Sequence, residues 1–196
     1  MFSFPFGMTL LDRDPAPAAS GDERAVVDAA RAGDGLAFRR LVEPHLAMLH
    51  RIAARVSPSL ADDAVQETLT LAYERLDRYQ PDTSFKAYLA AIAARRAHTL
   101  ARGERRRAKR QDRAPVAESP VTPEAELSGA QAARRIREVI LAMPQKRRQA
   151  ALLRLDAGLD YREIAAALDS TEGSARVLVH QALRQLRDEL GDLLPR

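Results

Sequence analysis

The sequence predicts an all-α protein made of two small helical domains joined by a flexible linker. Apolar residues recur at three- and four-residue steps and rarely alternate, which is typical of amphipathic helices and not of strands. Glycine and proline gather in a few short stretches that separate these apolar runs. The chain has 196 residues, 46% of them hydrophobic, so it has room for one ordinary domain or two small ones.

The first half of the chain predicts a flexible extension, residues 1–20, followed by a helical domain, residues 21–113. Ser20 and Glu23 fit a capping box at the start of the first helix. The second helix has an apolar stripe that contains Pro44, which predicts a kink or a break. Two further amphipathic helices follow, and the last of them is long and ends in a basic stretch. We therefore expect four helices in this domain.

A flexible linker is predicted at residues 114–128, because "APVAESPVTPEAELS" contains three Pro, three Glu and no basic residue. Residues 129–196 then form a second small domain, whose first helix is expected to begin at Gln131. Its last two helices lie within "REIAAALDSTEGSARVLVHQALRQL" and are separated by a short polar turn. This spacing fits a helix-turn-helix, a motif that binds DNA through its second helix.

The second helix of this motif has two different faces. Its inward stripe consists of Ala175, Val179, Ala182, Leu183 and Leu186, with Leu178 at the border. The opposite side consists of Gly173, Arg176, Val177, His180, Arg184 and Arg187, with Gln181 at its edge. Arginine and glutamine side chains can read base edges in the major groove, and a valine can contact a thymine methyl group. The alternative is an ordinary helical hairpin with a solvated basic face.

Basic residues are concentrated in one segment. The whole chain has 31 Lys and Arg against 27 Asp and Glu, a net charge of +4. Residues 102–113, "RGERRRAKRQDR", have seven basic and two acidic residues, a local net charge of +5. A phosphate-binding ridge is therefore predicted at Arg95, Arg96, Arg102, Arg105, Arg106, Arg107, Lys109 and Arg110. Alternatively, these basic side chains only stabilise the C-terminus of the helix by complementing its dipole.

An acidic face on the third helix, within "ADDAVQE", has three interpretations. Asp62, Asp63 and Glu67 could bind Mg²⁺, contact a basic protein or simply face solvent. Metal catalysis has the least support, because the sequence has no second carboxylate cluster and no glycine-rich phosphate loop. The four histidines do not have the spacing of metal ligands, and the sequence shows no arrangement of nucleophile, base and acid for covalent catalysis. We therefore expect no enzyme activity, no metal and no cofactor.

The chain contains no cysteine, which excludes disulfides and thiolate metal sites and permits a cytoplasmic location. No apolar run approaches the roughly 18 residues that a membrane-spanning helix needs. The N-terminus lacks the basic start of a signal peptide. We therefore expect a cytoplasmic protein without a membrane span.

Four blocks of the sequence, taken in order, resemble a known family. They are "AFRRLVEPHL", "DDAVQETLTLAYERLDRY", "SFKAYLAAIAARR" and "MPQKRRQAALLRLDAGLDYREIAAALDSTEGSARVLVHQALRQLR". The set is similar to the extracytoplasmic-function (ECF) sigma factors, two-domain members of the sigma-70 family of bacterial RNA polymerase. A stand-alone helix-turn-helix regulator of transcription is the alternative, although it leaves the acidic block unexplained.

The resemblance implies a region 2-like domain that binds core polymerase and the minus-ten element, and a region 4-like domain that binds the minus-thirty-five element. The implied polymerase contacts, with the β′ clamp helices, are Asp63, Gln66 and Glu67. The implied minus-ten residues are Tyr79, Ser84, Lys86, Tyr88, Arg95, Arg96, Thr99 and Arg102. The implied minus-thirty-five residues are Thr171, Ser174, Arg176, Val177, His180, Gln181 and Arg184. The implied partners are core RNA polymerase, through its β′ and β subunits, promoter DNA and an anti-sigma factor.

The sequence departs from the family pattern at seven positions. In the first domain, Tyr88 replaces a usual Trp, Arg95 a usual Asn, and Thr99 an Asp or Asn. In the second domain, the usual Gly and Ile of the turn and the usual Ser and Arg of the second helix are replaced by Asp169, Ser170, Val177 and Leu178. The base preferences of familiar members therefore do not carry over to this chain.

Overall fold

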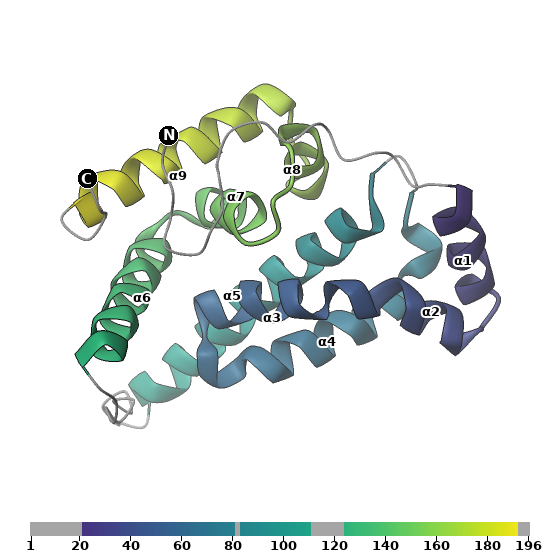
Figure 1. The fold of residues 1–196 in the computed structure, drawn as a ribbon, viewed down its shortest axis with the longest axis horizontal. Coiled ribbons are helices and arrows are strands. Elements are labelled where there is room, and N and C mark those ends of the chain that lie inside the picture. The colour runs from purple at the N-terminus through teal and green to yellow at the C-terminus, as the bar shows by residue number, and fades with distance from the viewer. Residues whose placement is uncertain (1–20, 81–82, 111–123, 192–196) are drawn as a thin grey trace.

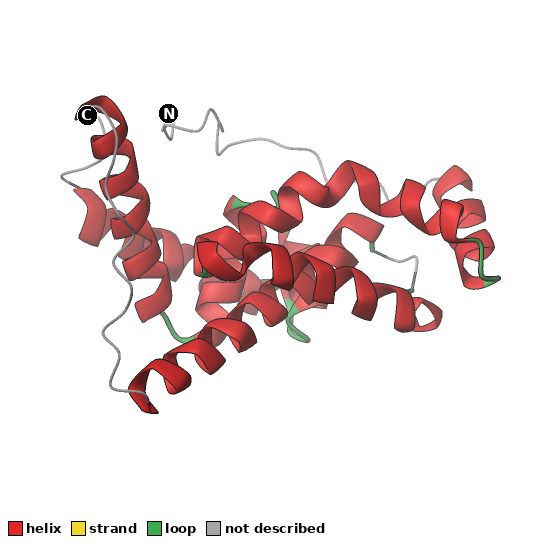
Figure 2. Cartoon of the chain, turned by 90° about the horizontal axis from the view of Figure 1, so that it is seen from below, coloured by secondary structure: helices red, strands yellow, loops and turns green. Residues whose placement is uncertain are grey.

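The computed structural model describes residues 21–80, 83–110 and 124–191, and all regular structure in these segments is helical (Figures 1 and 2). The predicted extension, residues 1–20, and most of the predicted linker lie outside this part of the chain. The first unit contains α1 (Gly21–Arg31), α2 (Gly35–Val42), α3 (Leu46–Val56), α4 (Ala61–Glu74) and α5 (Phe85–Arg110). The second contains α6 (Glu124–Ala142), α7 (Gln145–Leu155), α8 (Tyr161–Ala167) and α9 (Glu172–Leu190). None of the helices described is both long and apolar enough to cross a membrane.

The predicted break at Pro44 is confirmed. A 3₁₀ turn, Glu43–His45, separates α2 from α3, because proline cannot donate the backbone hydrogen bond that a continuous helix requires. Asp34 starts α2 by accepting hydrogen bonds from the backbone N–H groups of Leu36 and Ala37 at 2.8 and 3.1 Å. The first unit therefore has five helices where four were expected.

The helix α6 begins at Glu124, earlier than the expected start at Gln131, so the last residues of the predicted linker are helical. Alanine and leucine in this stretch favour the helix. The predicted end of the linker at residue 128 therefore falls within α6, and the rest of the predicted linker lies outside the described residues.

The helix-turn-helix has caps at both of its helices. Asp160 and Glu163 form a capping box at the start of α8, with the side chain of each accepting from the backbone N–H of the other. Thr171 caps α9 by accepting from the N–H of Ser174 at 3.2 Å. Between the helices, Asp169 has a φ of +50°, in the left-handed region that the glycine usual at this position adopts more readily.

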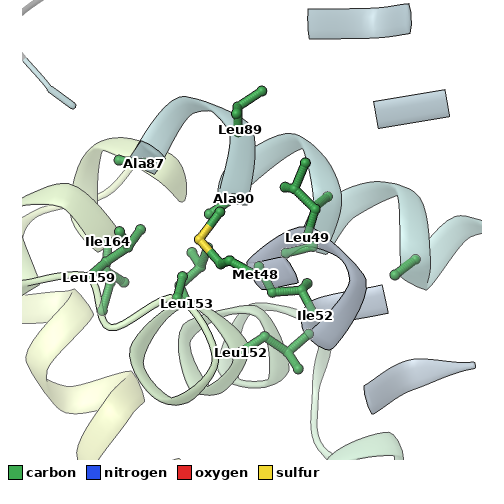
Figure 3. Close-up of a cluster of buried hydrophobic side chains, with 14 of the residues drawn as sticks. Met48, Leu49, Ile52, Ala87, Leu89, Ala90, Leu152, Leu153, Leu159 and Ile164 are labelled. Atoms are coloured by element: carbon green, nitrogen blue, oxygen red, sulfur yellow. The ribbon is translucent and has the colours of Figure 1, made fainter. Parts of the chain in front are cut away.

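The two units share one hydrophobic core. Figure 3 shows Met48 of α3 lying between Ala90 of α5 and Leu153 of α7. Leu159 and Ile164, which flank the start of α8, are fully buried beside the same cluster. In Figure 1, α7 and α8 lie against α3 and α5, whereas α9 runs along the side of the second unit that faces away from the first. The helix-turn-helix is thus packed against the first unit through α8, with its second helix turned outward.

Candidate polymerase-binding and DNA-binding surfaces

The outer face of α4 is acidic and accessible. Ala64, Thr68 and Ala72 are buried on its inner face, where the Thr68 hydroxyl donates to the carbonyl of Ala64 at 2.6 Å. Asp63 and Gln66 are exposed on the other side. Asp63 stands in the first turn, where a carboxylate complements the helix dipole. Two of the three predicted polymerase contacts are therefore free to meet a partner.

The third predicted contact, Glu67, already has an ionic partner within the chain. Its carboxylate pairs with the guanidinium of Arg96 on α5, and both side chains are about one third exposed, 39% and 32%. Arg96 is one of the residues predicted to bind minus-ten DNA. The structure thus joins a predicted polymerase contact to a predicted DNA contact, which residue spacing could not indicate because the two belong to different helices.

The predicted minus-ten residues surround the junction between the 3₁₀ turn Leu76–Arg78 and the start of α5. Tyr79 is buried, and its hydroxyl donates to the carbonyl of Thr83 at 2.8 Å and to Glu23 at 3.2 Å. Its ring contacts Phe85 edge-on and Tyr88 at a tilt, with ring centres 5.4 and 5.2 Å apart. In this conformation Tyr79 is a core residue that supports Tyr88, and its ring is not open to a stacking base.

Tyr88 is half-buried and lies at the edge of this aromatic cluster. Its hydroxyl donates to the carbonyl of Ala72 at 3.1 Å. Burial raises the pKa of the Tyr88 hydroxyl above its usual value, so the group stays protonated and remains a donor. A cleft of about 360 Å³ opens beside this ring and is lined by Arg75, Arg78 and Arg95 from the first unit and Glu163 and Ala166 from α8.

The remaining predicted minus-ten residues extend along α5. Ser84 and Lys86 are half-exposed at its start, and Arg102 is exposed near its basic end. The Thr99 hydroxyl is directed back to the helix and donates to the carbonyl of Arg95 at 3.0 Å. For the rest of the predicted phosphate-binding ridge, from Arg105 to Arg110, the structure describes the helical backbone of α5 and not the side chains.

The outer side of α9 brings together all seven predicted minus-thirty-five residues. Ala175, Val179 and Ala182 form its buried stripe, as expected. Val177 is 54% exposed and Leu178 flanks the core, so the expected orientations of this pair are confirmed. The side chains of Arg176 and Arg184 are 63% and 73% exposed. His180 and Gln181 are also exposed, while Thr171 and Ser174 lie at the N-terminus of the helix.

Three residues beside this face were not predicted from the sequence. The guanidinium carbons of Arg154 and Arg176 each lie 5.0 Å from the centre of the Tyr161 ring, a cation–π distance. Arg147 of α7 donates to the side-chain oxygen of Gln181 at 3.0 Å. Helical spacing identified one face of α9, but these contacts join it to α7 and α8 and depend on tertiary packing. The two arginines that contact Tyr161 lie seven residues before it and fifteen residues after it, so the sequence showed no signal for this cluster.

Metal binding on the acidic face has no structural support in the described segments. Asp62 lies 3.5 Å from His50 across the turn between α3 and α4. No group of three or more histidine, aspartate or glutamate side chains in these segments is arranged to hold a metal ion. The contact of Asp62 with a single imidazole is insufficient for a site.

Comparisons with known proteins identify two sigma-70 regions in the chain. The family described as Sigma-70 region 2 matches residues 41–107, and that described as Sigma-70, region 4 matches residues 133–186. The chain therefore has the polymerase-binding and promoter-binding regions of a sigma-70 protein. A stand-alone regulator built only on a helix-turn-helix would lack region 2, so that alternative is set aside.

Relatives of similar length define the family more closely. The ECF RNA polymerase sigma factor SigD of Mycobacterium tuberculosis is 35% identical over 195 residues, covering 92% of this chain and 90% of that protein. The RNA polymerase sigma factor CarQ of Myxococcus xanthus is 29% identical over 162 residues, covering 80% of this chain and 91% of that protein. The chain belongs to the ECF sigma factors of RNA polymerase. It binds core polymerase, recognises promoter DNA and initiates transcription.

Two solved structures share the fold. CnrH in complex with the cytosolic domain of CnrY has a TM-score of 0.65 and 23% identity, and the match covers 87% of this chain and 97% of CnrH. The sigma factor RpoE from Bartonella quintana, in complex with the anti-sigma factor NepR, has a TM-score of 0.60 and 21% identity over 79% of this chain and 96% of that chain. At 23% and 21% sequence identity, the similarity to these two structures establishes the fold alone.

Proposed function

We propose that this sigma factor docks on core polymerase through α4 and reads its promoter with two separate surfaces, one on α5 and one on α9. The observation that carries this assignment is the outer side of α9. Its basic and hydrogen-bonding side chains are exposed opposite a stripe of buried alanines and valine, as a helix lying in the major groove requires.

The polymerase contact is proposed for Asp63, Gln66 and Glu67. Exposed carboxylates on one helix face suit a basic partner, and their long-range attraction also accelerates docking. Asp63 is the cleanest position for a test, because its reversal breaks no ion pair in the described segments, whereas reversal of Glu67 would repel Arg96. Asp63→Arg should abolish binding to core enzyme in a pull-down. Glu43→Arg is the matched control, because Glu43 is also an exposed first-turn residue and is in no ion pair in the described segments.

The minus-ten contact is proposed for the side of α5 that carries Ser84, Lys86, Tyr88, Arg95, Arg96, Thr99 and Arg102, with Tyr79 beneath it. Tyr88 offers the ring on which an unpaired base would stack, and stacking contributes on the order of 1–3 kcal/mol per base. The arginines would hold the phosphates of the separated strand. Arg95 replaces the family's usual asparagine, so we expect a different base preference at the position that it contacts.

The minus-thirty-five contact is proposed for Thr171, Ser174, Arg176, Val177, His180, Gln181 and Arg184. Thr171 and Ser174 lie at the helix N-terminus, where hydroxyl and N–H groups suit a phosphate. Arg176 and Gln181 have the donors to read base edges, and Val177 has an apolar surface for a thymine methyl group. We place the protein in the cytoplasm as a binding factor without enzyme activity.

An anti-sigma partner is also proposed. Both solved structures described above are complexes, CnrH with the cytosolic domain of CnrY and the sigma factor RpoE with the anti-sigma factor NepR. In vitro transcription with purified core enzyme on a library of genomic fragments tests the main assignment. Defined start sites that share two upstream elements are expected, and the absence of any start site above the level of core enzyme alone would refute it.

A further inference from the structure

The side chain of Gln181 on α9 is held by a residue of another helix. Arg147 of α7 donates from one terminal guanidinium nitrogen to Oε1 of Gln181 at 3.0 Å, and from the other to Oε1 of Gln185 at 3.3 Å. The two glutamines stand four residues apart, on the edge of α9 that meets α7. One arginine therefore contacts two successive turns of the helix whose outer side is proposed to read the minus-thirty-five element.

The guanidinium of Arg147 determines which way each of these amides faces. The oxygen and nitrogen of a glutamine amide have nearly the same shape, so only their partners distinguish them. A guanidinium has donors alone, so the glutamine atom that it contacts must be the oxygen. Gln185 gives an independent check, because its Nε2 donates to the carboxylate of Glu189, which is an acceptor, at 2.8 Å. The direction of Gln181 is thus set by the chemistry of its partner.

Arg147 is packed against the protein, whereas Gln181 reaches the surface. The Nε atom of Arg147 is buried and the residue as a whole is partly buried, while Gln181 is exposed. The planar guanidinium of an arginine held in this way loses little further freedom when its two ends bond. Gln181 lies one turn from Val177 and from Arg184 on the same side of α9. Its amide therefore stands beside the reading face with its oxygen already bonded to α7.

We propose that Arg147 sets a base preference in the minus-thirty-five element by holding Gln181 so that its NH₂ group, and not its oxygen, faces the base edge. This inference rests on the proposed function of the outer side of α9. An unrestrained glutamine pairs with adenine, donating to N7 and accepting from the N6 amino group. With its oxygen turned to Arg147, Gln181 offers donors alone, which suit the adjacent O6 and N7 acceptors of guanine. Arg147 is thus a positioning residue that favours guanine over adenine at one position.

Holoenzyme made from core polymerase and the full chain tests this proposal on a promoter library randomised across the minus-thirty-five element. Sequencing of the transcripts gives the preference for each base at each position. Gln181→Ala identifies the position that Gln181 contacts, because base preference should be lost there. Arg147→Met keeps the apolar stem but has no donor, so it should lower the ratio of guanine to adenine at that position by about fivefold or more. Arg147→Lys, which also has donors alone, should retain the preference for guanine.

The matched control is Lys146→Met, which removes the same charge from the neighbouring residue of α7. Lys146 is exposed, and no hydrogen bond joins it to Gln181 in the described segments. The control should leave every base preference unchanged. In the Gln181→Ala background, Arg147→Met should also change no base preference, because Arg147 acts through Gln181. A further change in that background would overturn the positioning role, since Arg147 would then read a base itself.

Gln181→Glu keeps the test decisive if Arg147→Met does not fold, because the position is exposed and the two side chains have the same shape. Its carboxylate can bond Arg147 through one oxygen and present the other to the groove, so adenine or cytosine, which offer an amino group, should replace guanine. Adenine preferred by the unaltered protein, or guanine still preferred by Gln181→Glu, would overturn the proposal. An unchanged profile for Gln181→Ala would instead refute the proposed minus-thirty-five contact of Gln181, so the two failures are distinguishable.

Discussion

Arg55 and Asp156 form a buried ion pair, and replacing one of them should destabilise the protein more than replacing the other. The Asp156 side chain is 3% exposed, whereas that of Arg55 is 24% exposed. Arg55→Met keeps the apolar stem of the arginine but leaves a carboxylate buried without its cation, which costs about 3–5 kcal/mol. Asp156→Asn keeps an oxygen acceptor of the same shape and leaves Arg55 partly hydrated, so the charge-assisted part of the bond, about 1–2 kcal/mol, is lost. Arg55→Met should be the more destabilising variant by about 2 kcal/mol.

Urea unfolding followed by circular dichroism measures this difference. With an m-value of about 3 kcal/mol per M, the midpoint of Arg55→Met should fall by about 1 M or more. The double variant Arg55→Met/Asp156→Asn also removes the buried negative charge, so it should be more stable than Arg55→Met alone. Two independent sites would instead give additive losses of stability, so this result would show that the two residues are coupled. A double variant no more stable than Arg55→Met, or an Asp156→Asn variant at least as unstable, would refute the argument.

Four further predictions concern the second unit and the basic helix. Val177→Ser should change the preferred base at one minus-thirty-five position with little loss of stability, and selection from a randomised site measures it; an unchanged profile would mean that Val177 reads no base. Tyr161→Leu should lower the free energy of unfolding in urea by roughly 1 kcal/mol through loss of the cation–π contacts, whereas Tyr161→Phe should retain them. Asp160→Ala should lower the free energy of unfolding by about 0.5–2 kcal/mol in urea, because α8 loses its cap. Arg102→Gln should reduce the salt dependence of single-strand binding by about 0.7 in the log–log slope if Arg102 contacts one phosphate.

The sequence predicted the features that depend on local chemistry. Pro44 broke a helix where a backbone donor was missing, and the two faces of α9 followed from residue spacing alone. Val177 and Leu178, adjacent in sequence, were assigned opposite environments correctly because successive helical residues lie about 100° apart. A helix break and the two faces of a helix depend on residues close in sequence, so both could be predicted without the tertiary structure.

The sequence did not predict which residue or helix a given side chain contacts in the folded protein. The capping box expected for Ser20 and Glu23 stays a prediction, because Ser20 lies outside the described residues. The sequence did not predict that the Glu23 carboxylate accepts hydrogen bonds from Tyr79 and from the backbone N–H of Phe85. Ala90 is small and apolar, as a core residue of the first unit would be, but in Figure 3 it lies on the opposite side of Met48 from Leu153 of α7, at the contact between the two units. Periodicity shows that a side chain is buried and does not show against which element.

The unequal exposure of the two promoter surfaces implies an order of events. In this structure, α9 presents Arg176, Val177 and Arg184 to solvent, while Ser84 and Arg95 are bonded to α8. Duplex DNA can meet α9 without any change in the protein, whereas a strand proposed to bind α5 must replace α8 as the partner of Ser84 and Arg95. If core polymerase is held through α4 as proposed, attachment through α4 and α9 raises the effective concentration of the strand beside α5. We therefore expect strand capture to be the last contact to form.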